Sequence, residues 1–148
     1  MKQLKTKICL NKQNQKINIP RWKQIKGWLT SIGNIENYQI GLLNYNIVTD
    51  EYLLELNNRV LKHNYYTDII TFNLSDSKDV IEGDIYISID RVNENATVFH
   101  VKRMEEMRRV MAHGLLHLCG YNDKTPQQKI EMKEKENFYL ERYNTTYK

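Results

Sequence analysis

The chain has few of the features that mark secreted or membrane-spanning proteins. It has two cysteines, Cys9 and Cys119, among 148 residues, and no secretory segment precedes them. The N-terminus leads into no apolar run long enough for a signal peptide or a membrane span. We therefore expect free thiols, a reducing compartment and a soluble protein of the cytoplasm that has no membrane partner.

Proline and glycine are also scarce. Two prolines and six glycines are spread along the chain, and no linker rich in them, repeat or low-complexity tract divides it. Hydrophobic residues make up 41% and charged residues 27%, an ordinary globular balance. The length suits one hydrophobic core, so we predict a single domain over residues 1–148.

The first acidic residue of the chain is Glu36, and no residue before it carries a negative side chain. The formal net charge is +4, and a one-signed surface attracts polyanions such as RNA. The alternative source of this bias is composition, since the chain is rich in Lys, Asn, Ile and Tyr, as an AT-rich genome produces. The basic residues before Glu36 are Lys2, Lys5, Lys7, Lys12, Lys16, Arg21, Lys23 and Lys26.

Four segments have the apolar pattern of β-strands. They are residues 4–10, in which Leu4, Thr6, Ile8 and Leu10 alternate with polar residues, and residues 38–48, 68–74 and 84–90. The last two lie close in sequence, and the short polar segment 75–82 between them is typical of an antiparallel hairpin loop.

Four other segments repeat apolar residues at helical spacing. The first opens at Pro20, the second follows a Thr49–Asp50 N-cap and ends near Asn64, the third covers residues 101–119, and the last opens at Pro126. The residues expected to face the core are Trp22, Ile25, Leu29 and Ile32, then Leu53, Leu56 and Val60, then Met104, Met107, Met111, Leu115 and Leu118, and finally Phe138, Tyr139 and Leu140. The predicted fold is α+β, a small mixed β-sheet with helices packed mainly on one face.

The end of the third helix carries ligand chemistry. His113 and His117 are four residues apart, Gly120 stops the helix, and Asp123 follows on the turn. A step of four places both imidazoles on one helical face, about 6 Å apart along the axis, so both can reach one metal ion. Asp123 can fold back as a third ligand and leave one position for water, as in catalytic zinc sites. We predict a metal site at this helix end and turn, facing a cleft beside residues 67–72.

Other interpretations of this motif stay open. The histidines can instead be helix residues hydrogen-bonded to backbone or water, and Asp123 a turn residue. Gly114 stands where peptidases of the His-Glu-x-x-His type carry their general base, which disfavours that mechanism. A close approach by a strand or substrate explains a mid-helix glycine, which costs about 1 kcal/mol. Cys119 would lie about 200° around the helix from His117, which favours a core position over a ligand role.

These residues match a known pattern. Residues 113–123, His-Gly-Leu-Leu-His-Leu-Cys-Gly-Tyr-Asn-Asp, resemble the signature His-Gly-x-Leu-His-Leu-x-Gly-Tyr-Asp-His of the YbeY family, bacterial metal-dependent endoribonucleases of ribosomal RNA maturation. Residues 67–72, Thr-Asp-Ile-Ile-Thr-Phe, are similar to its Thr-Asp-Val-Leu-Ser-Phe strand, and residues 83–88 to its Gly-Asp-Ile-x-Ile-Ser strand. The blocks keep the family's order.

The chain departs from the family at two places. The family's third metal histidine aligns with Asp123, so the resemblance implies His113, His117 and Asp123 as the metal ligands. The family's arginine ahead of the Thr-Asp strand falls on Leu61. Arg59 and Lys62 flank that position and are candidates for binding RNA phosphates. Arg109 shares the helical face of His113 and is either a third phosphate binder or a charge behind the ligands.

The resemblance implies a single-strand endoribonuclease of ribosomal RNA maturation and ribosome quality control, with the small ribosomal subunit as partner. We expect one zinc ion, with manganese, iron or nickel as alternatives, and a metal-activated water or a 2′-hydroxyl as the attacking group in place of a side chain. A carboxylate in place of an imidazole leaves the site one charge less positive. We therefore expect a higher pH optimum with Asp123 than in an Asp123→His variant.

Two other classes of function remain possible on the sequence. The first is a non-catalytic metal-binding ribosome-assembly factor that binds RNA. The second is a different metallohydrolase, such as a peptidase or a deaminase. The absence of a Pro-Cys-x-x-Cys pair speaks against the zinc deaminases, as Gly114 does against the peptidases.

Overall fold

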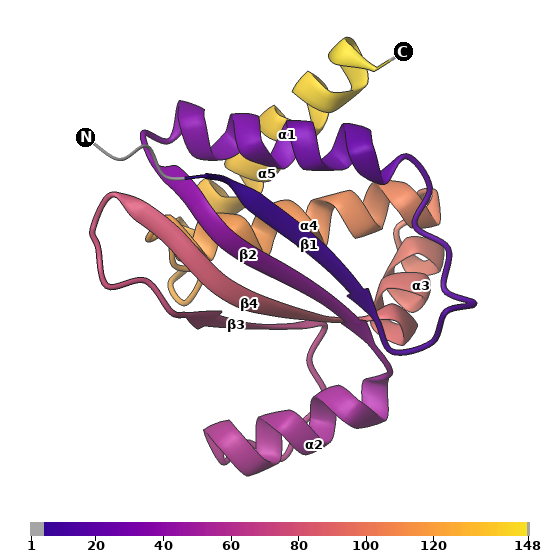
Figure 1. Cartoon of the computed structure of the whole chain (residues 1–148). Coiled ribbons are helices and arrows are strands. Elements are labelled where there is room, and N and C mark those ends of the chain that lie inside the picture. The colour runs from indigo at the N-terminus through magenta and orange to yellow at the C-terminus, as the bar shows by residue number, and fades with distance from the viewer. Residues whose placement is uncertain (1–4, 148) are drawn as a thin grey trace.

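A computed structural model describes residues 5–147, and Lys2 and Leu4 of the sequence analysis lie outside them. In chain order the elements are β1 (Lys7–Lys12), α1 (Trp22–Ile35), β2 (Gln39–Val48), α2 (Asp50–Leu61), β3 (Ile69–Asn73), β4 (Val80–Ser88), α3 (Ile89–Val98), α4 (Arg103–Leu118) and α5 (Pro126–Thr146) (Figure 1). Within this range no helix is both long enough and apolar enough to cross a membrane.

The four strands form one mixed sheet in the order β1-β2-β4-β3. The pairs β1–β2 and β2–β4 are parallel, and β3 runs antiparallel to β4, which confirms the predicted hairpin. A parallel neighbour requires a crossover, and α1 supplies it between β1 and β2. The mixed sheet and the α+β class are therefore as predicted.

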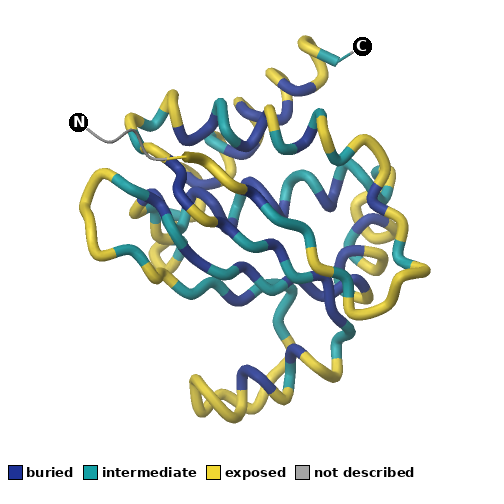
Figure 2. Tube along the Cα trace, viewed as in Figure 1, coloured by how far each residue is buried: buried dark blue, intermediate teal, exposed yellow. Residues whose placement is uncertain are grey.

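Most helices cover one face of the sheet. Side chains of α1, α3, α4 and α5 join the inward residues of β2 and β4 in the main hydrophobic core, while α2 packs on the opposite face (Figure 1). A small second cluster holds α2 there through Leu53, Leu56 and Ile70. Buried residues concentrate in the strands and on the inner sides of the helices, whereas the outer turns of α2 are exposed (Figure 2).

Several predicted boundaries are wrong. Strand β4 runs from Val80 to Ser88 and not over residues 84–90, so the predicted loop 75–82 is too long by its last residues. Residues Ile89 and Asp90 instead begin α3, which the sequence analysis missed. The Ser88 hydroxyl caps this helix by accepting a hydrogen bond from the Arg91 amide. The helix is mostly polar and buries three residues, Ile89, Val92 and Ala96, which explains its weak pattern.

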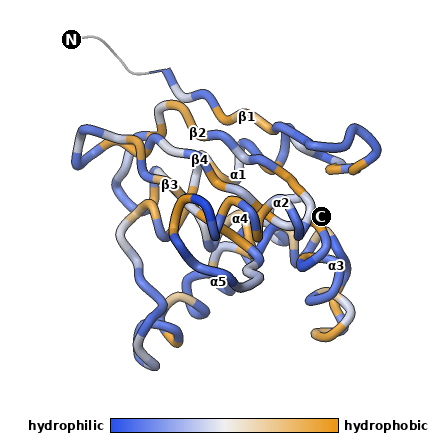
Figure 3. The backbone as a smooth tube through the Cα atoms, turned by 90° about the horizontal axis from the view of Figure 1, so that it is seen from below, coloured by the Kyte–Doolittle hydropathy of each residue, from blue (hydrophilic) through white to orange (hydrophobic). Residues whose placement is uncertain are grey.

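Two predicted core residues face solvent instead. Val60 is 47% exposed and Phe138 is 49% exposed, whereas the other helix residues expected inside are buried or partly buried. Helix α2 ends at Leu61, before the predicted Asn64, because Lys62 adopts a left-handed conformation with φ of 59°. Helix α5 is largely hydrophilic along its length, and the apolar residues concentrate in the strands and on α4 (Figure 3).

Candidate metal centre

Helix α4 is fixed by its apolar side, which leaves a polar side for chemistry. Met107, Met111 and Leu115 repeat every four residues and are fully buried against the sheet. His113 and His117 follow the same spacing and are half-buried, at 20% and 23% side-chain exposure. Both imidazoles therefore project from one stripe of a helix that cannot rotate without exposing its core residues.

Gly114 lets this helix approach the sheet closely. A methyl group on Gly114 would lie 2.8 Å from Cδ1 of Ile69 on β3 and 3.0 Å from Cγ2 of Ile85 on β4. These distances are too short for carbon atoms in contact, so any larger residue would require the side chains of Ile69 and Ile85 to move. The prediction that a neighbouring strand occupies the space is confirmed.

The turn after α4 is defined by two capping motifs. The Gly120 amide donates to the His117 carbonyl and the Tyr121 amide to the Leu116 carbonyl, a Schellman motif with Gly120 at φ of 100°. Four residues later, Thr125 and Gln128 form a reciprocal capping box that begins α5. Asp123 lies between these two motifs and is thereby returned towards the end of α4.

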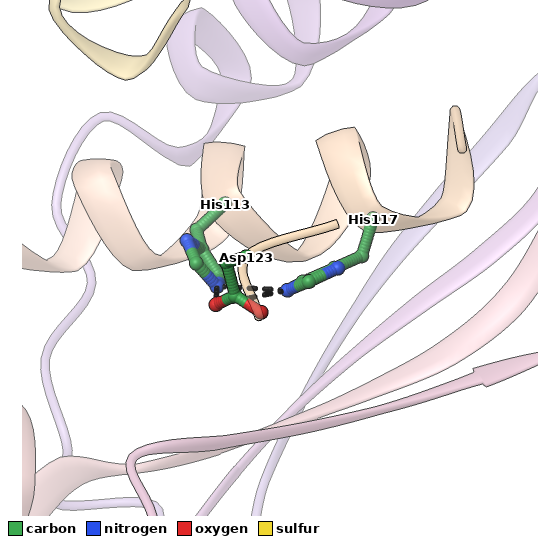
Figure 4. Close-up of side chains that lie close together, drawn as sticks. All are labelled: His113, His117 and Asp123. Carbon is green, nitrogen blue, oxygen red and sulfur yellow. Dashed lines mark hydrogen bonds and ion pairs between the residues drawn. The ribbon is translucent and has the colours of Figure 1, made fainter. Parts of the chain in front are cut away.

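The three predicted ligands converge (Figure 4). Nε2 of His113 lies 3.0 Å from Nε2 of His117, and Oδ2 of Asp123 lies 3.2 Å and 3.5 Å from these two nitrogens. Ligands about 2.0–2.1 Å from a tetrahedral zinc ion are about 3.3 Å from each other. The three atoms thus have the separation that a single ion requires, and the group can hold one.

His113 is oriented from behind by α5. Its Nδ1 lies 2.6 Å from Oε2 of the buried Glu136, whose other oxygen accepts a hydrogen bond from Arg109 at 2.9 Å. Burial lowers the pKa of His113, but the hydrogen bond and charge of Glu136, with Asp123, outweigh it and raise that pKa. An environment that favours a positive imidazolium also favours a divalent cation at the same place, so the donor set fits a metal ion.

His117 is oriented by the main chain. Its Nδ1 lies 2.9 Å from the carbonyl oxygen of Tyr121, which leaves Nε2 free for a metal. The Tyr121 hydroxyl in turn donates to Glu36 at 2.7 Å, at the end of α1. Glu36 also accepts hydrogen bonds from Lys135 at 3.2 Å and from Tyr139. Burial opposes ionisation of Glu36, but these donors prevail and lower its pKa.

Two further buried carboxyl groups on this side of the centre have raised pKa values. Burial raises the pKa of Asp68, just before β3, and the charges of Glu136 and Asp123 add to this, while His113 opposes it. Burial also raises the pKa of Glu106, on α4, to about 7. Ile69, the residue after Asp68, packs against Gly114 next to His113, so the predicted 67–72 segment begins close to this end of α4. The His113 side of the centre is therefore crowded with acids.

The other predicted residues differ in how close they lie to the three predicted ligands. Arg109 donates to Glu136 and, at 2.7 Å, to Asn137, so it stands behind the ligands. Arg59, in the last turn of α2, and Lys62, just after it, are exposed across the sheet from α4, and no contact within residues 5–147 joins them to the three predicted ligands. Cys119 is 8% exposed in the core, which confirms its predicted role, and burial raises its pKa to about 12.

Sequence reasoning missed three residues that orient the ligands. Glu136, Tyr121 and Glu36 come from α5, the turn and α1, and their contacts with one another or with His113 span as many as 85 positions. A glutamate in a polar helix has no local pattern that sets it apart. The signal that was available is Glu136 at a core-facing step of four from Met132 and Leu140, both of which are buried.

Comparisons with known proteins agree with this geometry. A family model described as Endoribonuclease YbeY matches residues 8–144. Endoribonuclease YbeY of Cytophaga hutchinsonii is 49% identical over 133 residues, covering 90% of this chain and 93% of the relative. That of Flavobacterium psychrophilum is 46% identical over 117 residues, covering 79% and 83%. The solution structure of TM1509 from Thermotoga maritima matches with a TM-score of 0.66 and 28% identity, covering 95% of this chain and 91% of that one. The chain therefore belongs to the Endoribonuclease YbeY family.

Proposed function

We propose that this protein is a metal-dependent endoribonuclease that cleaves single-stranded RNA in ribosomal RNA processing. The observation that carries the proposal is the convergence of His113, His117 and Asp123 at 3.0–3.5 Å in a chain of this family. Three protein ligands leave one coordination position open, which is the arrangement of catalytic sites and not of closed structural ones. We prefer the enzyme to the non-catalytic assembly factor for this reason.

We propose zinc as the cofactor, one ion per chain. Two imidazoles and a carboxylate suit zinc, and the carboxylate also admits manganese or iron, with nickel a further alternative. When bound, such an ion polarises a phosphoryl oxygen and makes water a stronger nucleophile near neutral pH.

The chain's own residues position this chemistry. The Nδ1 hydrogens of His113 and His117 are held by Glu136 and by the Tyr121 carbonyl, so each Nε2 presents its lone pair to the metal. Arg109 balances the charge of Glu136, and we assign it that role in preference to phosphate binding. The buried side of α4 and the capped turn keep the three ligands in register.

RNA contacts are proposed for the end of α2. Arg59 and Lys62 are exposed cations there, and residues 62–68 run from this end to Ile69, which packs against Gly114 next to His113. Tyr65 and Tyr66 in this segment are 56% and 50% exposed and offer aromatic faces to unpaired bases. We propose that one domain, residues 1–148, carries these surfaces and acts in the cytoplasm on RNA of the small ribosomal subunit.

Cleavage of labelled ribosomal RNA tests the proposal. The protein is stripped of metal, reloaded with zinc or manganese and compared with a His113→Ala/His117→Ala variant and with His100→Asn. His100 is exposed and has positive φ, which asparagine tolerates, so this variant is a matched control. Cleavage by the reloaded protein and the control alone supports the enzyme. RNA binding by all three proteins without cleavage would instead establish the assembly factor.

A further inference from the structure

A hollow lies beside the stripe of α4 that carries the two histidines. Its volume is about 350 Å³. It is lined by Phe99, Val101, Glu105, Glu106, Arg109 and Lys133. Glu136, which holds His113, also borders it, so one carboxylate separates this hollow from the metal centre.

The hollow is close to the metal centre along the helix axis. Arg109 and Glu106 precede His113 by four and seven residues, which corresponds to about 6 Å and about 10 Å. A strand of RNA whose phosphate lies at the metal ligands can therefore place a neighbouring nucleotide over this hollow. Ligand pockets have volumes of roughly 300–1,000 Å³, so the hollow has room for a base.

Among the described residues, Glu106 at this hollow has no hydrogen-bond donor, and only the charge of Arg109 offsets its own. The residue is 4% exposed, and within residues 5–147 its carboxyl group makes no hydrogen bond or ion pair. The nearby Arg109 is already bonded to Glu136 and Asn137. Its oxygens keep some contact with solvent at the hollow, since Arg108 Nε is the one fully buried side-chain N or O atom without a partner within residues 5–147. A mostly buried acceptor without a donor costs free energy, so a ligand that reaches it with N–H groups is favoured here.

The rest of the lining suits a flat, uncharged group. Phe99 is 60% exposed and offers an aromatic face, and Val101 adds apolar surface. Three glutamates repel a phosphate from the interior, whereas the exposed Lys133 can meet a backbone phosphate outside it. Aromatic stacking combined with hydrogen bonds to the Watson–Crick edge is how proteins recognise unpaired bases.

We propose that this hollow is a nucleobase pocket that accepts an unpaired base of the RNA substrate, with guanine as the best match. Guanine presents two adjacent donors, N1–H and the N2 amino group, to the two oxygens of one carboxylate, and no other RNA base has such a pair. The pocket would give the nuclease a sequence preference near the cleaved bond. The inference rests on the endoribonuclease function proposed above.

Binding of nucleosides tests the pocket independently of cleavage. The zinc-loaded protein is titrated with guanosine, adenosine, cytidine and uridine while the methyl NMR signals of Val101 are followed. We expect guanosine to bind about tenfold more tightly than the others, and Glu106→Gln to remove this preference. Phe99→Ala should weaken all four nucleosides about tenfold. Val98→Ala, whose side chain is equally exposed at 60% but outside the lining, is the matched control and should change nothing.

Cleavage patterns give the second test. Short single-stranded RNAs that carry one guanine in a run of uracil should be cut at a fixed distance from the guanine, and Glu106→Gln should spread the cuts. Cleavage that ignores the guanine, or guanosine binding that leaves Val101 unmoved, overturns the pocket while the nuclease stands. No cleavage of any RNA with guanosine still bound in the pocket overturns the nuclease and leaves the pocket.

Discussion

Buried carboxyl groups on the two sides of the metal centre have pKa values shifted in opposite directions. Behind His117, Glu36 accepts hydrogen bonds from Tyr121, Tyr139 and Lys135, which lower its pKa despite burial. Two turns before His113 on α4, burial raises the pKa of Glu106 to about 7, and the charge of Arg109 opposes this only in part. Glu36 thus belongs to a hydrogen-bonded network, whereas ionisation of the buried Glu106 costs folding free energy.

The two groups of carboxylates therefore have different roles: one stabilises the scaffold of the site, and the other lies where ligands bind. The Glu36 network joins α1, α5 and the turn that carries Asp123, so its hydrogen bonds stabilise the scaffold. The acids beside His113 gain little from the protein itself, but they lie where a metal ion and RNA donors arrive. Natural proteins tolerate such locally unfavourable groups mainly at functional sites. Stability and metal binding should therefore respond differently to mutations on the two sides.

The largest effect on stability is expected at Glu36, on the His117 side of the centre. Glu36→Ala leaves two hydroxyl groups and Lys135 without their acceptor and should lower the free energy of unfolding by about 3 kcal/mol at pH 7. Urea denaturation measures this. Glu94→Ala removes an exposed ion pair with Arg91 and should cost less than about 0.5 kcal/mol. Equal losses in the two variants would mean that the network contributes no more than a surface pair.

Zinc affinity should depend most on the His113 side of the centre, where Glu136 orients the imidazole. Glu136→Gln removes the carboxylate that orients His113 and should weaken zinc binding roughly 10- to 100-fold, as losses behind metal ligands do. Competition with a chromophoric chelator gives the affinity. Glu134→Gln changes an exposed glutamate of the same helix and is the matched control.

Tyr121→Phe sharpens this contrast between the two imidazoles. It retains the carbonyl that orients His117 and removes only the hydroxyl bonded to Glu36, so we expect zinc affinity to change less than about threefold. Stability should fall by about 1 kcal/mol. A zinc affinity as weak as that of Glu136→Gln would show that the turn, and not the individual acceptor, sets the ligand geometry.

The pH dependence of stability should identify the unsupported acid. The pKa of Glu106 is near 4.5 in the unfolded chain and about 7 in the folded one, so the folded state binds this proton more tightly. The contribution is fully present below pH 4.5 and is lost as pH rises through 7. Glu106→Gln should therefore stabilise the protein by about 2 kcal/mol at pH 8 and not at pH 4.

Denaturant unfolding at the two pH values checks this expectation, with Glu105→Gln as control, since Glu105 is the preceding residue and only partly buried. A gain that is the same at pH 4 and pH 8 would point to better packing of the amide and not to titration of the acid. Only a gain that appears with rising pH matches the contrast with Glu36.

What the sequence predicted depends on how local the cause is. The convergence of His113, His117 and Asp123 follows from spacing within eleven residues, and the helix stop follows from Gly120, because both are properties of one helix and its turn. Gly114 as a close-packing residue was predictable for the same reason. The orienting groups Glu136 and Glu36 were not, since tertiary packing brings them to the site from other helices.

The fold shows the same division. The mixed sheet and its hairpin were predictable from alternation and from the short polar connection, and α3 was missed because it buries three residues of a polar segment. The end of β4 was wrong because Ser88 begins a helix by capping it, while the apolar alternation continues through Ile89. At that position the hydrogen bond that caps the helix, and not the apolar periodicity, decides where the strand ends.

The last effect concerns Asp123, the predicted ligand that departs from the family pattern. Asp123 is 39% exposed and brings a negative charge within 3.5 Å of both imidazoles. A carboxylate ligand weakens the field that acidifies the attacking water, so Asp123→His should move the acidic limb of the pH–rate profile down by about one pH unit. Asn122→His, at the exposed preceding position, is the control. Coincident acidic limbs in all three proteins would show that Asp123 does not act on the metal and that two imidazoles alone set its chemistry.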